Sequence, residues 1–315
     1  MVSLTTELII GFSAGIVLLL VASSYLIKSV ETVSKKMKIS YFLLGFLIMA
    51  IGTSLPEISV SFASSVLGRP AFSLANILGS NLADICVVIG AAAFFGLKVD
   101  KKVANATFIF LGFSLLLMFF LVDGALNIAE GAMLLALGVV YFYFITRKET
   151  GKAVPVEMKK EPAFFKSYFY IPIFIFWLII ASFLIVTTGT FLAVRLGIPI
   201  SFIGFALLAV GTALPEALST VIIMLRGHAP EFVWGTLLGG NIVNIFLGVG
   251  AGPIFGRYKI NFGEFFYQFL FMIIATAVLG LMMKFKKKLD WKDGIILILI
   301  YAAAFYFVIT GQKLF

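Results

Sequence analysis

The chain has 315 residues, of which 62% are hydrophobic and only 12% are charged, and its mean hydropathy is +1.13. A soluble domain of this length carries about twice as much charge, so the composition excludes an ordinary water-soluble protein. The single cysteine, Cys86, excludes an intramolecular disulfide and a thiolate metal cluster.

In chain order, the sequence predicts ten apolar segments, each about as long as an α-helix that crosses a bilayer. They cover residues 8–30, 40–67, 72–97, 105–122, 126–146, 167–196, 199–226, 230–256, 264–284 and 291–312. The first is too long for the apolar region of a signal peptide and follows no basic segment, so it is interpreted as a membrane helix. We therefore expect an all-α polytopic membrane protein with ten transmembrane helices.

The basic residues predict the orientation of the chain. When the loops are numbered alternately from the N-terminus, one set carries 19 Lys and Arg residues and the other carries 5. The positive-inside rule places the first set in the cytoplasm, so both termini are expected outside the cell membrane. The net charge of +9 is thus a topology signal rather than a nucleic-acid interface, which needs basic residues interleaved with aromatics on a solvated face.

One long polar connection, Arg147 to Lys166, separates five spans from five. Its Gly, Pro and charged residues are typical of a flexible linker. We therefore predict a first five-helix repeat at residues 1–146, a cytoplasmic linker at 147–166 and a second five-helix repeat at 167–315.

The two halves repeat each other in sequence. Residues 45–57 align without gaps to residues 204–216, eight of the thirteen positions are identical, and both copies end in Gly-Thr-x-Leu-Pro-Glu. One helix later, residues 78–85 (LGSNLADI) align to residues 238–245 (LGGNIVNI). Because each half has an odd number of spans, the second half crosses the membrane in the opposite direction. Such inverted repeats are typical of secondary transporters.

Three acidic residues lie in the middle of predicted spans: Glu57, Asp84 and Glu216. No Lys, Arg or His lies at comparable depth in the sequence, and an ionised acid at the bilayer centre costs about 2.5–3.5 kcal/mol or more. A mobile cation or a proton is therefore expected to neutralise them. A structural alternative, in which protonated acids only donate hydrogen bonds between helices, accounts poorly for the proline beside the glutamate in both copies.

The residues around these acids favour a metal ion. Glu57, Glu216, Asp84 and Asn244 each have a small or polar residue four positions earlier, on the same helix face. The pairs are Thr53 and Glu57, Thr212 and Glu216, Ser80 and Asp84, and Gly240 and Asn244. Pro56 and Pro215 free backbone carbonyls about one turn upstream. Oxygen ligands without Cys or His suit Ca²⁺, Na⁺ or Mg²⁺, and two glutamates facing each other suit the flexible coordination of Ca²⁺.

These paired motifs resemble the α-repeats of the cation/calcium exchanger superfamily, most closely those of prokaryotic sodium/calcium exchangers. The resemblance covers all ten spans. It implies that Glu57 and Glu216 are the central Ca²⁺ ligands, and that Asp84 and Asn244 complete a diamond of four broken helices. It also implies oxygen ligands from Thr53 and Thr212, backbone carbonyl ligands from Ala50 and Ala209, and Na⁺ ligands from Ser54 and Ser80. Helices 1 and 6 are expected to slide as a pair.

The function implied by the resemblance is antiport of Ca²⁺ for Na⁺ across the cell membrane by alternating access. Two departures from the family pattern stand out. Ala213 and Gly240 occupy positions where the later repeat of the family has serine, and the acid and the amide are exchanged between Asp84 and Asn244. Because two hydroxyl ligands are missing, exchange of Ca²⁺ for H⁺ remains an alternative.

Other classes of protein fit the sequence less well. An intramembrane enzyme would need a general base near Ser54, but the single histidine, His228, lies in a predicted loop. A channel could use the same ligands, but the inverted repeat weighs against it. The expected partners are the lipid bilayer and the transported ions, with no nucleic acid and no obligatory protein partner.

Overall fold

The structure, a computed structural model, describes residues 2–34, 54–149, 163–209, 220 and 230–311. Within these residues, eight helices are long and apolar enough to cross a membrane. They correspond to eight of the ten predicted spans, and parts of the predicted spans 40–67 and 199–226 lie outside the described residues. The chain is therefore a helical polytopic membrane protein.

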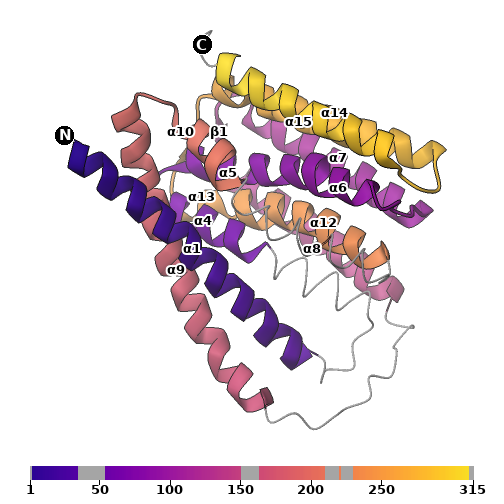
Figure 1. The fold of residues 1–315 in the computed structure, drawn as a ribbon, viewed down its shortest axis with the longest axis horizontal. Coiled ribbons are helices and arrows are strands. Elements are labelled where there is room, and N and C mark those ends of the chain that lie inside the picture. Colours follow the sequence, from indigo (N-terminus) through magenta and orange to yellow (C-terminus); the bar gives the residue numbers. More distant parts are fainter. Residues whose placement is uncertain (1, 35–53, 150–162, 210–219, 221–229, 312–315) are drawn as a thin grey trace.

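The long helices α1 (Val2–Ser34) and α9 (Ala163–Leu196) lie side by side and run obliquely to the other helices (Figure 1). Gly11 and Gly15 of α1 allow this close approach. A Cβ on Gly11 would lie 3.0 Å from Thr188 Cγ2, and one on Gly15 would lie 2.8 Å from Ile185 Cγ1. Only 17% of the residues in the most apolar stretch of α1 are buried, so most of its surface is suited to lipid.

The first central helix is continuous from Pro70 to Ala93. α5 (Pro70–Ala83) passes through a π-helical segment, η3 (Asp84–Val88), into α6 (Ile89–Ala93). In its most apolar stretch 94% of the residues are buried, which makes it the centre of the molecule. Pro70 lies in the first turn, where the missing N–H is not needed by the helix.

The second central helix has the same construction. α12 (Pro230–Val243) begins at a proline, becomes the π-helical segment η5 (Asn244–Val249), and is followed by α13 (Gly252–Phe255). In its most apolar stretch 83% of the residues are buried. The π-helical segments begin at Asp84 and Asn244, which the repeat aligns, and such segments occur frequently at functional sites.

The spans that carry the two Pro-Glu motifs are described in part. In the first half, α4 (Leu55–Val66) carries Pro56 in its first turn, where proline is tolerated. In the second half, α10 (Ile200–Phe202) leads into the π-helical segment η4 (Ile203–Leu208).

Four uninterrupted helices pack around the centre: α7 (Lys101–Leu121), α8 (Ile128–Glu149), α14 (Phe262–Phe285) and α15 (Trp291–Gly311). α14 packs on α7 and α15, α15 packs on α6, and α8 packs on η5. α15 can approach α6 closely because Gly90 and Gly294 face each other; a Cβ on Gly294 would collide with the Gly90 carbonyl oxygen. Helix α8 extends to Glu149 and α9 begins at Ala163, so both helices continue into the predicted linker.

The hydrophobic interior forms two clusters. The larger surrounds the two central helices, and the smaller joins α1, α4 and α9 through residues such as Phe12, Val60 and Leu178. Ser182 of α9 also donates a hydrogen bond to Ser59 of α4 at 2.9 Å. One face of α4 therefore packs on α1 and α9, and another face points toward the central helices.

Two short backbone pairings join the halves at opposite ends of α7. Beyond its C-terminal end, β1 (Ala125–Leu126) pairs antiparallel with β2 (Tyr258–Lys259). Before its N-terminal end, the Val99 N–H donates to the Lys287 carbonyl at 2.9 Å, and the Leu289 N–H donates to the Leu97 carbonyl at 2.8 Å. Each pairing thus connects a loop of the first half to a loop of the second.

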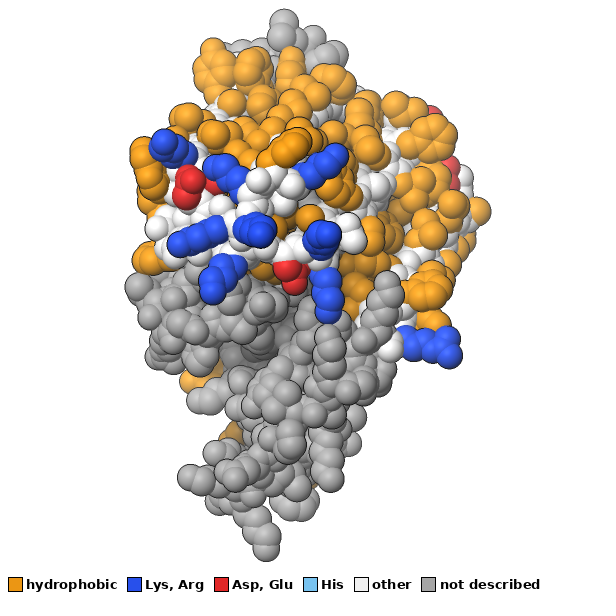
Figure 2. Space-filling model, turned by 90° about the vertical axis from the view of Figure 1, so that its right-hand side faces the viewer, with side chains coloured by type: hydrophobic (Ala, Val, Ile, Leu, Met, Phe, Trp, Pro, Cys, Tyr) orange, Lys and Arg blue, Asp and Glu red, His pale blue; other side chains and the backbone are white. Residues whose placement is uncertain are grey.

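Exposed lysines gather at the end of the molecule where α7 begins and α14 turns into α15 (Figure 2). They are Lys98, Lys101, Lys102, Lys284, Lys287, Lys288 and Lys292. All of them belong to the loops that the sequence predicts to be cytoplasmic.

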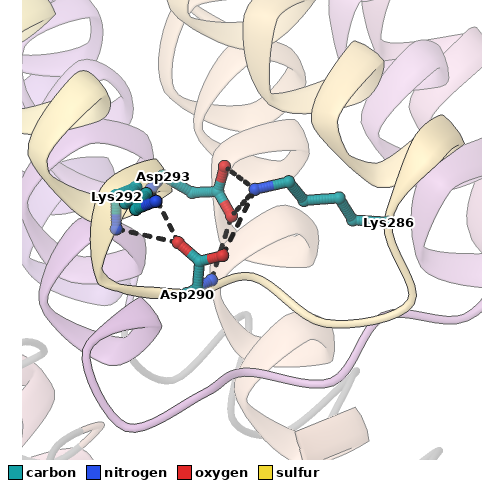
Figure 3. Close-up of polar contacts among 4 residues, drawn as sticks. All are labelled: Lys286, Asp290, Lys292 and Asp293. Carbon is teal, nitrogen blue, oxygen red and sulfur yellow. Dashed lines mark hydrogen bonds and ion pairs between the residues drawn. The ribbon is translucent and has the colours of Figure 1, made fainter.

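The turn between α14 and α15 is organised around a buried carboxylate (Figure 3). Lys286 Nζ lies 2.7 Å from Asp293 Oδ1 and 3.4 Å from Asp290 Oδ2, and the Asp293 side chain is 3% exposed. The hydrogen bond to Asp293 raises the pKa of Lys286 above its ordinary value. A backbone hydrogen bond from Lys292 is the main cause that lowers the pKa of Asp290.

Candidate cation site

Glu57 lies inside the protein at the start of α4. It is 2% exposed and sits in the first turn, where the positive end of the helix dipole favours a carboxylate. Asn76 of α5 donates from Nδ2 to the Glu57 backbone carbonyl at 3.3 Å, and Ser80 Oγ donates to Glu57 Oε1 at 3.5 Å. α5 therefore orients both the backbone and the carboxylate of Glu57.

A polar stripe on the first central helix faces this glutamate. Asn76, Ser80 and Asp84 are four residues apart, share a helix face and are all buried. The contact between Ser80 and Glu57 brings two of the predicted site residues together. Sequence reasoning missed Asn76, although its position four residues before Ser80 was a usable signal.

The two central helices meet through a reciprocal pair of asparagines. Asn81 Nδ2 donates to the Asn241 backbone carbonyl at 3.1 Å, and Asn241 Nδ2 donates to the Asn81 backbone carbonyl at 3.4 Å. Both residues are fully buried and occupy aligned positions of the repeat. The contact is therefore self-complementary, as it is across a twofold axis. Sequence reasoning gave neither residue a role, although the identical asparagine in both copies was the signal.

Asn244 is held by the first half of the chain. Its Nδ2 donates to Asn81 Oδ1 at 3.0 Å, and the residue is 2% exposed. Asp84, its counterpart, is 3% exposed and also begins a π-helical segment. Both predicted members of the acid and amide pair are thus in the buried centre, next to the asparagine pair.

Two more predicted site residues border this centre. Ala209, at the end of η4, lies against Gly79; a Cβ on Gly79 would lie 2.6 Å from Ala209 Cβ. This close packing brings η4 beside the residue that precedes Ser80. Ser54 is 3% exposed and precedes α4, and its side chain makes no capping hydrogen bond with that helix.

The other four predicted ligands, Ala50, Thr53, Thr212 and Glu216, lie outside the described residues. Among the residues that the structure describes, no three Asp, Glu, Cys or His side chains form a cluster that could hold a metal. The described part of the site therefore consists of one glutamate, one aspartate and a surrounding set of amides and hydroxyls. Oxygen donors of this kind suit hard cations.

The sequence also matches known proteins in both halves. The model of the sodium/calcium exchanger protein family matches residues 7–147 and 166–310, and these stretches contain all ten predicted site residues. The chain belongs to this family. The family resemblance seen in the sequence is thereby confirmed.

Three known proteins are similar to this chain over nearly its whole length. The sodium/calcium exchanger MaX1 of Methanosarcina acetivorans is 27% identical over 92% of this chain and 95% of its own length. The inner membrane protein YrbG of Escherichia coli is 25% identical over 89% of this chain and 88% of its own. A solved structure of the sodium-calcium exchanger NCX_Mj, soaked with Na⁺ and Sr²⁺, superposes with a TM-score of 0.67. It is 26% identical and covers 95% of this chain and 98% of its own.

Proposed function

We propose that this protein is a secondary antiporter that exchanges Ca²⁺ for Na⁺ across the cell membrane by alternating access. The observation that carries the proposal is the position of Glu57. It is a buried acid in the first turn of α4, in a chain that belongs to the sodium/calcium exchanger family. The names of MaX1 and NCX_Mj support Ca²⁺ and Na⁺ as the transported ions.

The proposed ligand set combines described and undescribed residues. Glu57 and Glu216 are the central Ca²⁺ ligands, with oxygens from Thr53 and Thr212 and backbone carbonyls from Ala50 and Ala209. Ser54 and Ser80 contribute hydroxyls, and the hydrogen bond from Ser80 to Glu57 supports a role for Ser80 beside that carboxylate. Asp84 and Asn244 complete the set.

Charge explains why such a site exchanges ions. An empty pocket with two or three carboxylates in a low dielectric carries a charge whose transfer across the membrane is very costly. One Ca²⁺, several Na⁺ or protons neutralise the carboxylates, so only a filled pocket can change sides. Because the cations compete for the same oxygens, binding of one requires release of the other. Alternation between them gives antiport.

We further propose that the protein has ten transmembrane helices in two inverted repeats, 1–146 and 167–315, with both termini outside. Three features support the inverted repeat: π-helical segments that begin at aligned residues, the reciprocal asparagines, and the two backbone pairings. The repeat relates the two backbone pairings to each other. In one, the loop after the third span pairs with the loop before the tenth. In the other, the equivalent loops pair: the loop after the eighth span with the loop before the fifth.

Exchange of Ca²⁺ for H⁺ is the second candidate. Ser80 places a hydroxyl 3.5 Å from the Glu57 carboxylate, whereas the aligned residue in the second half is Gly240, which has no side chain. Fewer hydroxyl ligands disfavour the binding of several Na⁺ ions and favour a proton as the replacement for Ca²⁺.

Uptake of ⁴⁵Ca²⁺ into proteoliposomes tests both candidates. The vesicles carry either an outward Na⁺ gradient at constant pH or a pH gradient without Na⁺, with the membrane voltage held by K⁺ and valinomycin. We expect the Na⁺ gradient to drive saturable Ca²⁺ accumulation. Accumulation driven only by the pH gradient would establish the proton exchanger, and Ca²⁺ flux that needs neither gradient would indicate a channel.

A further inference from the structure

A line of serines extends from Glu57 along the centre-facing side of α4. Ser61 and Ser65 follow Glu57 at intervals of four residues, so the three side chains lie on one face of the helix. All three residues are at least 95% buried. This face is opposed by η5 and α13, which pack against α4.

The opposing helix presents glycines at the same spacing. Gly248 and Gly252 follow Asn244 at intervals of four residues. A Cβ on Gly248 would lie 3.5 Å from Ser61 Oγ, and a Cβ on Gly252 would lie 3.2 Å from Ser65 Oγ. Each serine hydroxyl therefore faces a glycine, and we call these four residues the serine–glycine seam.

The Ser61 hydroxyl has an unusual environment. Ser61 is 0% exposed, and its Oγ has no hydrogen-bond partner among the described residues. A buried hydroxyl without a partner costs about 1–3 kcal/mol. In contrast, Ser65 Oγ donates to the Ser61 backbone carbonyl at 2.9 Å. The Ser61 hydroxyl is thus a buried oxygen one helical turn from Glu57 that no described residue uses.

The seam is closed in this conformation. Ile77 of α5 borders it, because a Cβ on Gly248 would lie 2.7 Å from Ile77 Cδ1. The ring of Tyr258 borders the other end, since a Cβ on Gly252 would lie 2.5 Å from its Cδ2 and Cε2 atoms. Opening the seam requires α4 to separate from η5 and α13.

The aligned positions of the first half have a different character. Where Asn244 is followed by Gly248 and Gly252, Asp84 is followed by Val88 and Ala92, which are fully buried. At these aligned positions the first half therefore has side chains where the second half has none. The small, hydroxyl-lined surface is therefore a property of one end of the site and not of the repeat.

We propose that the serine–glycine seam is the route by which hydrated cations reach Glu57 from the end of the membrane where the α4–α5 turn lies, with the Ser61 hydroxyl as a transient ligand. The inference rests on the proposed antiport. It assigns a cation-contacting role to Ser61 and Ser65, which lie outside the ligand set proposed for the central site.

Cysteine labelling tests the route. In a Cys86→Ala background, which removes the single, buried native thiol, single variants Ser61→Cys and Ser65→Cys are made in the full chain. Ala63→Cys is the matched control, because Ala63 lies between them but packs in the cluster with α1 and α9. Arg69→Cys, at an exposed residue of the α4–α5 turn, reports which side of the membrane this turn faces.

A membrane-impermeant cationic methanethiosulfonate reagent is added to one side of sealed vesicles at a time. We expect Ser61→Cys and Ser65→Cys to react from the same side as Arg69→Cys, and Ala63→Cys to react at least about tenfold more slowly, because buried thiols are inert. Ca²⁺ is expected to slow the reaction of Ser61→Cys. Failure of both serine positions to react, or reaction only from the side opposite to Arg69→Cys, would overturn the proposal.

Flux through a glycine variant gives a second, independent measurement. Gly248→Ala is expected to lower the maximal Ca²⁺ uptake rate about tenfold and to change the half-saturating Ca²⁺ concentration less than about twofold, because it obstructs passage rather than binding. Gly90→Ala is a buried control away from the seam; its Cβ would lie 3.2 Å from Ile298 Cγ1, compared with 2.7 Å from Ile77 Cδ1 for a Cβ on Gly248. Equal rates for the two variants would refute the route. Absence of Ca²⁺ uptake by the unmodified protein would instead refute the proposed antiport.

Discussion

The two central helices share one backbone construction but carry different side chains at aligned positions. Residues 70–93 and 230–255 both begin at a proline, both become π-helical at an aligned residue, and they exchange hydrogen bonds through aligned asparagines. The first carries a serine and an aspartate, Ser80 and Asp84, at positions where the second carries Gly240 and Asn244.

This difference shows that the repeat constrains the backbone more strongly than the side chains. In the proposed inverted-repeat arrangement, four equivalent positions surround one centre, and a ligand contributed by either half would reach the same ion. One acid and one amide therefore give the same total charge in either order. This symmetry can be tested by substituting the proposed ligand residues of one half at a time.

The largest effect is expected from the acid at the start of α4. Glu57→Gln should reduce Ca²⁺ affinity by about 100-fold or more and abolish transport. Substituting residues that only hydrogen-bond to a metal ligand already lowers metal affinity about 10–100-fold, and loss of a ligand should have a larger effect. Isothermal titration in detergent and ⁴⁵Ca²⁺ uptake measure the two quantities. Glu130→Gln is the control, because Glu130 accepts a hydrogen bond from the Asn127 N–H at the start of α8, away from the site. Ca²⁺ uptake by Glu57→Gln at the normal rate would exclude this residue as a ligand.

The exchange of acid and amide tests the symmetry directly. Asp84→Asn should lower Ca²⁺ affinity about tenfold, because one carboxylate is lost, and should change the dependence of Ca²⁺ flux on Na⁺ and pH. The double variant Asp84→Asn with Asn244→Asp restores the charge at the aligned position and should recover most of the affinity. A double variant no better than Asp84→Asn alone would mean that the halves do not contribute to a common site.

The positions of the membrane helices could be predicted from the sequence better than the contacts between them. The apolar run 264–284 became α14, Phe262–Phe285, because length and hydropathy determine a membrane helix. The π-helical segments were not predicted, since a shift in backbone hydrogen bonding leaves no mark in composition. The spacing to Ser80 marked Asn76 as a member of the polar face, but its bond to the Glu57 carbonyl could not be derived, because that bond depends on how α4 packs against α5.

The reciprocal asparagines should show a smaller, unequal effect. Asn81→Ala and Asn241→Ala each remove one hydrogen bond to a buried carbonyl, at a cost of about 1–3 kcal/mol of stability. Asn81→Ala should lower the apparent Tm in detergent further, because Asn81 Oδ1 also accepts a hydrogen bond from Asn244. Asn105→Ala, at an exposed position of α7, is the control. A larger loss for Asn241→Ala would contradict the observed hydrogen bonds.

The smallest effect is expected at the turn between α14 and α15, which has no part in the ion site. The pKa of Lys286 is raised above 10.5, so its contribution to stability is complete below that value and is lost as pH rises through the raised pKa. The pKa of Asp290 is lowered below 3.8, so its contribution is complete above that value and is lost as pH falls through the lowered pKa.

Because the pKa of Lys286 is raised and that of Asp290 is lowered, these two residues contribute no pH dependence between about pH 5 and 9. Lys286→Met and Asp290→Asn should therefore leave the shape of the pH profile of Ca²⁺ flux unchanged from pH 5 to 9, while Lys286→Met lowers the apparent Tm. Any pH dependence measured in this range then arises elsewhere, and its loss in Asp84→Asn would assign it to the half that carries the acid. A profile shifted by Lys286→Met would show instead that the basic end of the molecule communicates with the ion site.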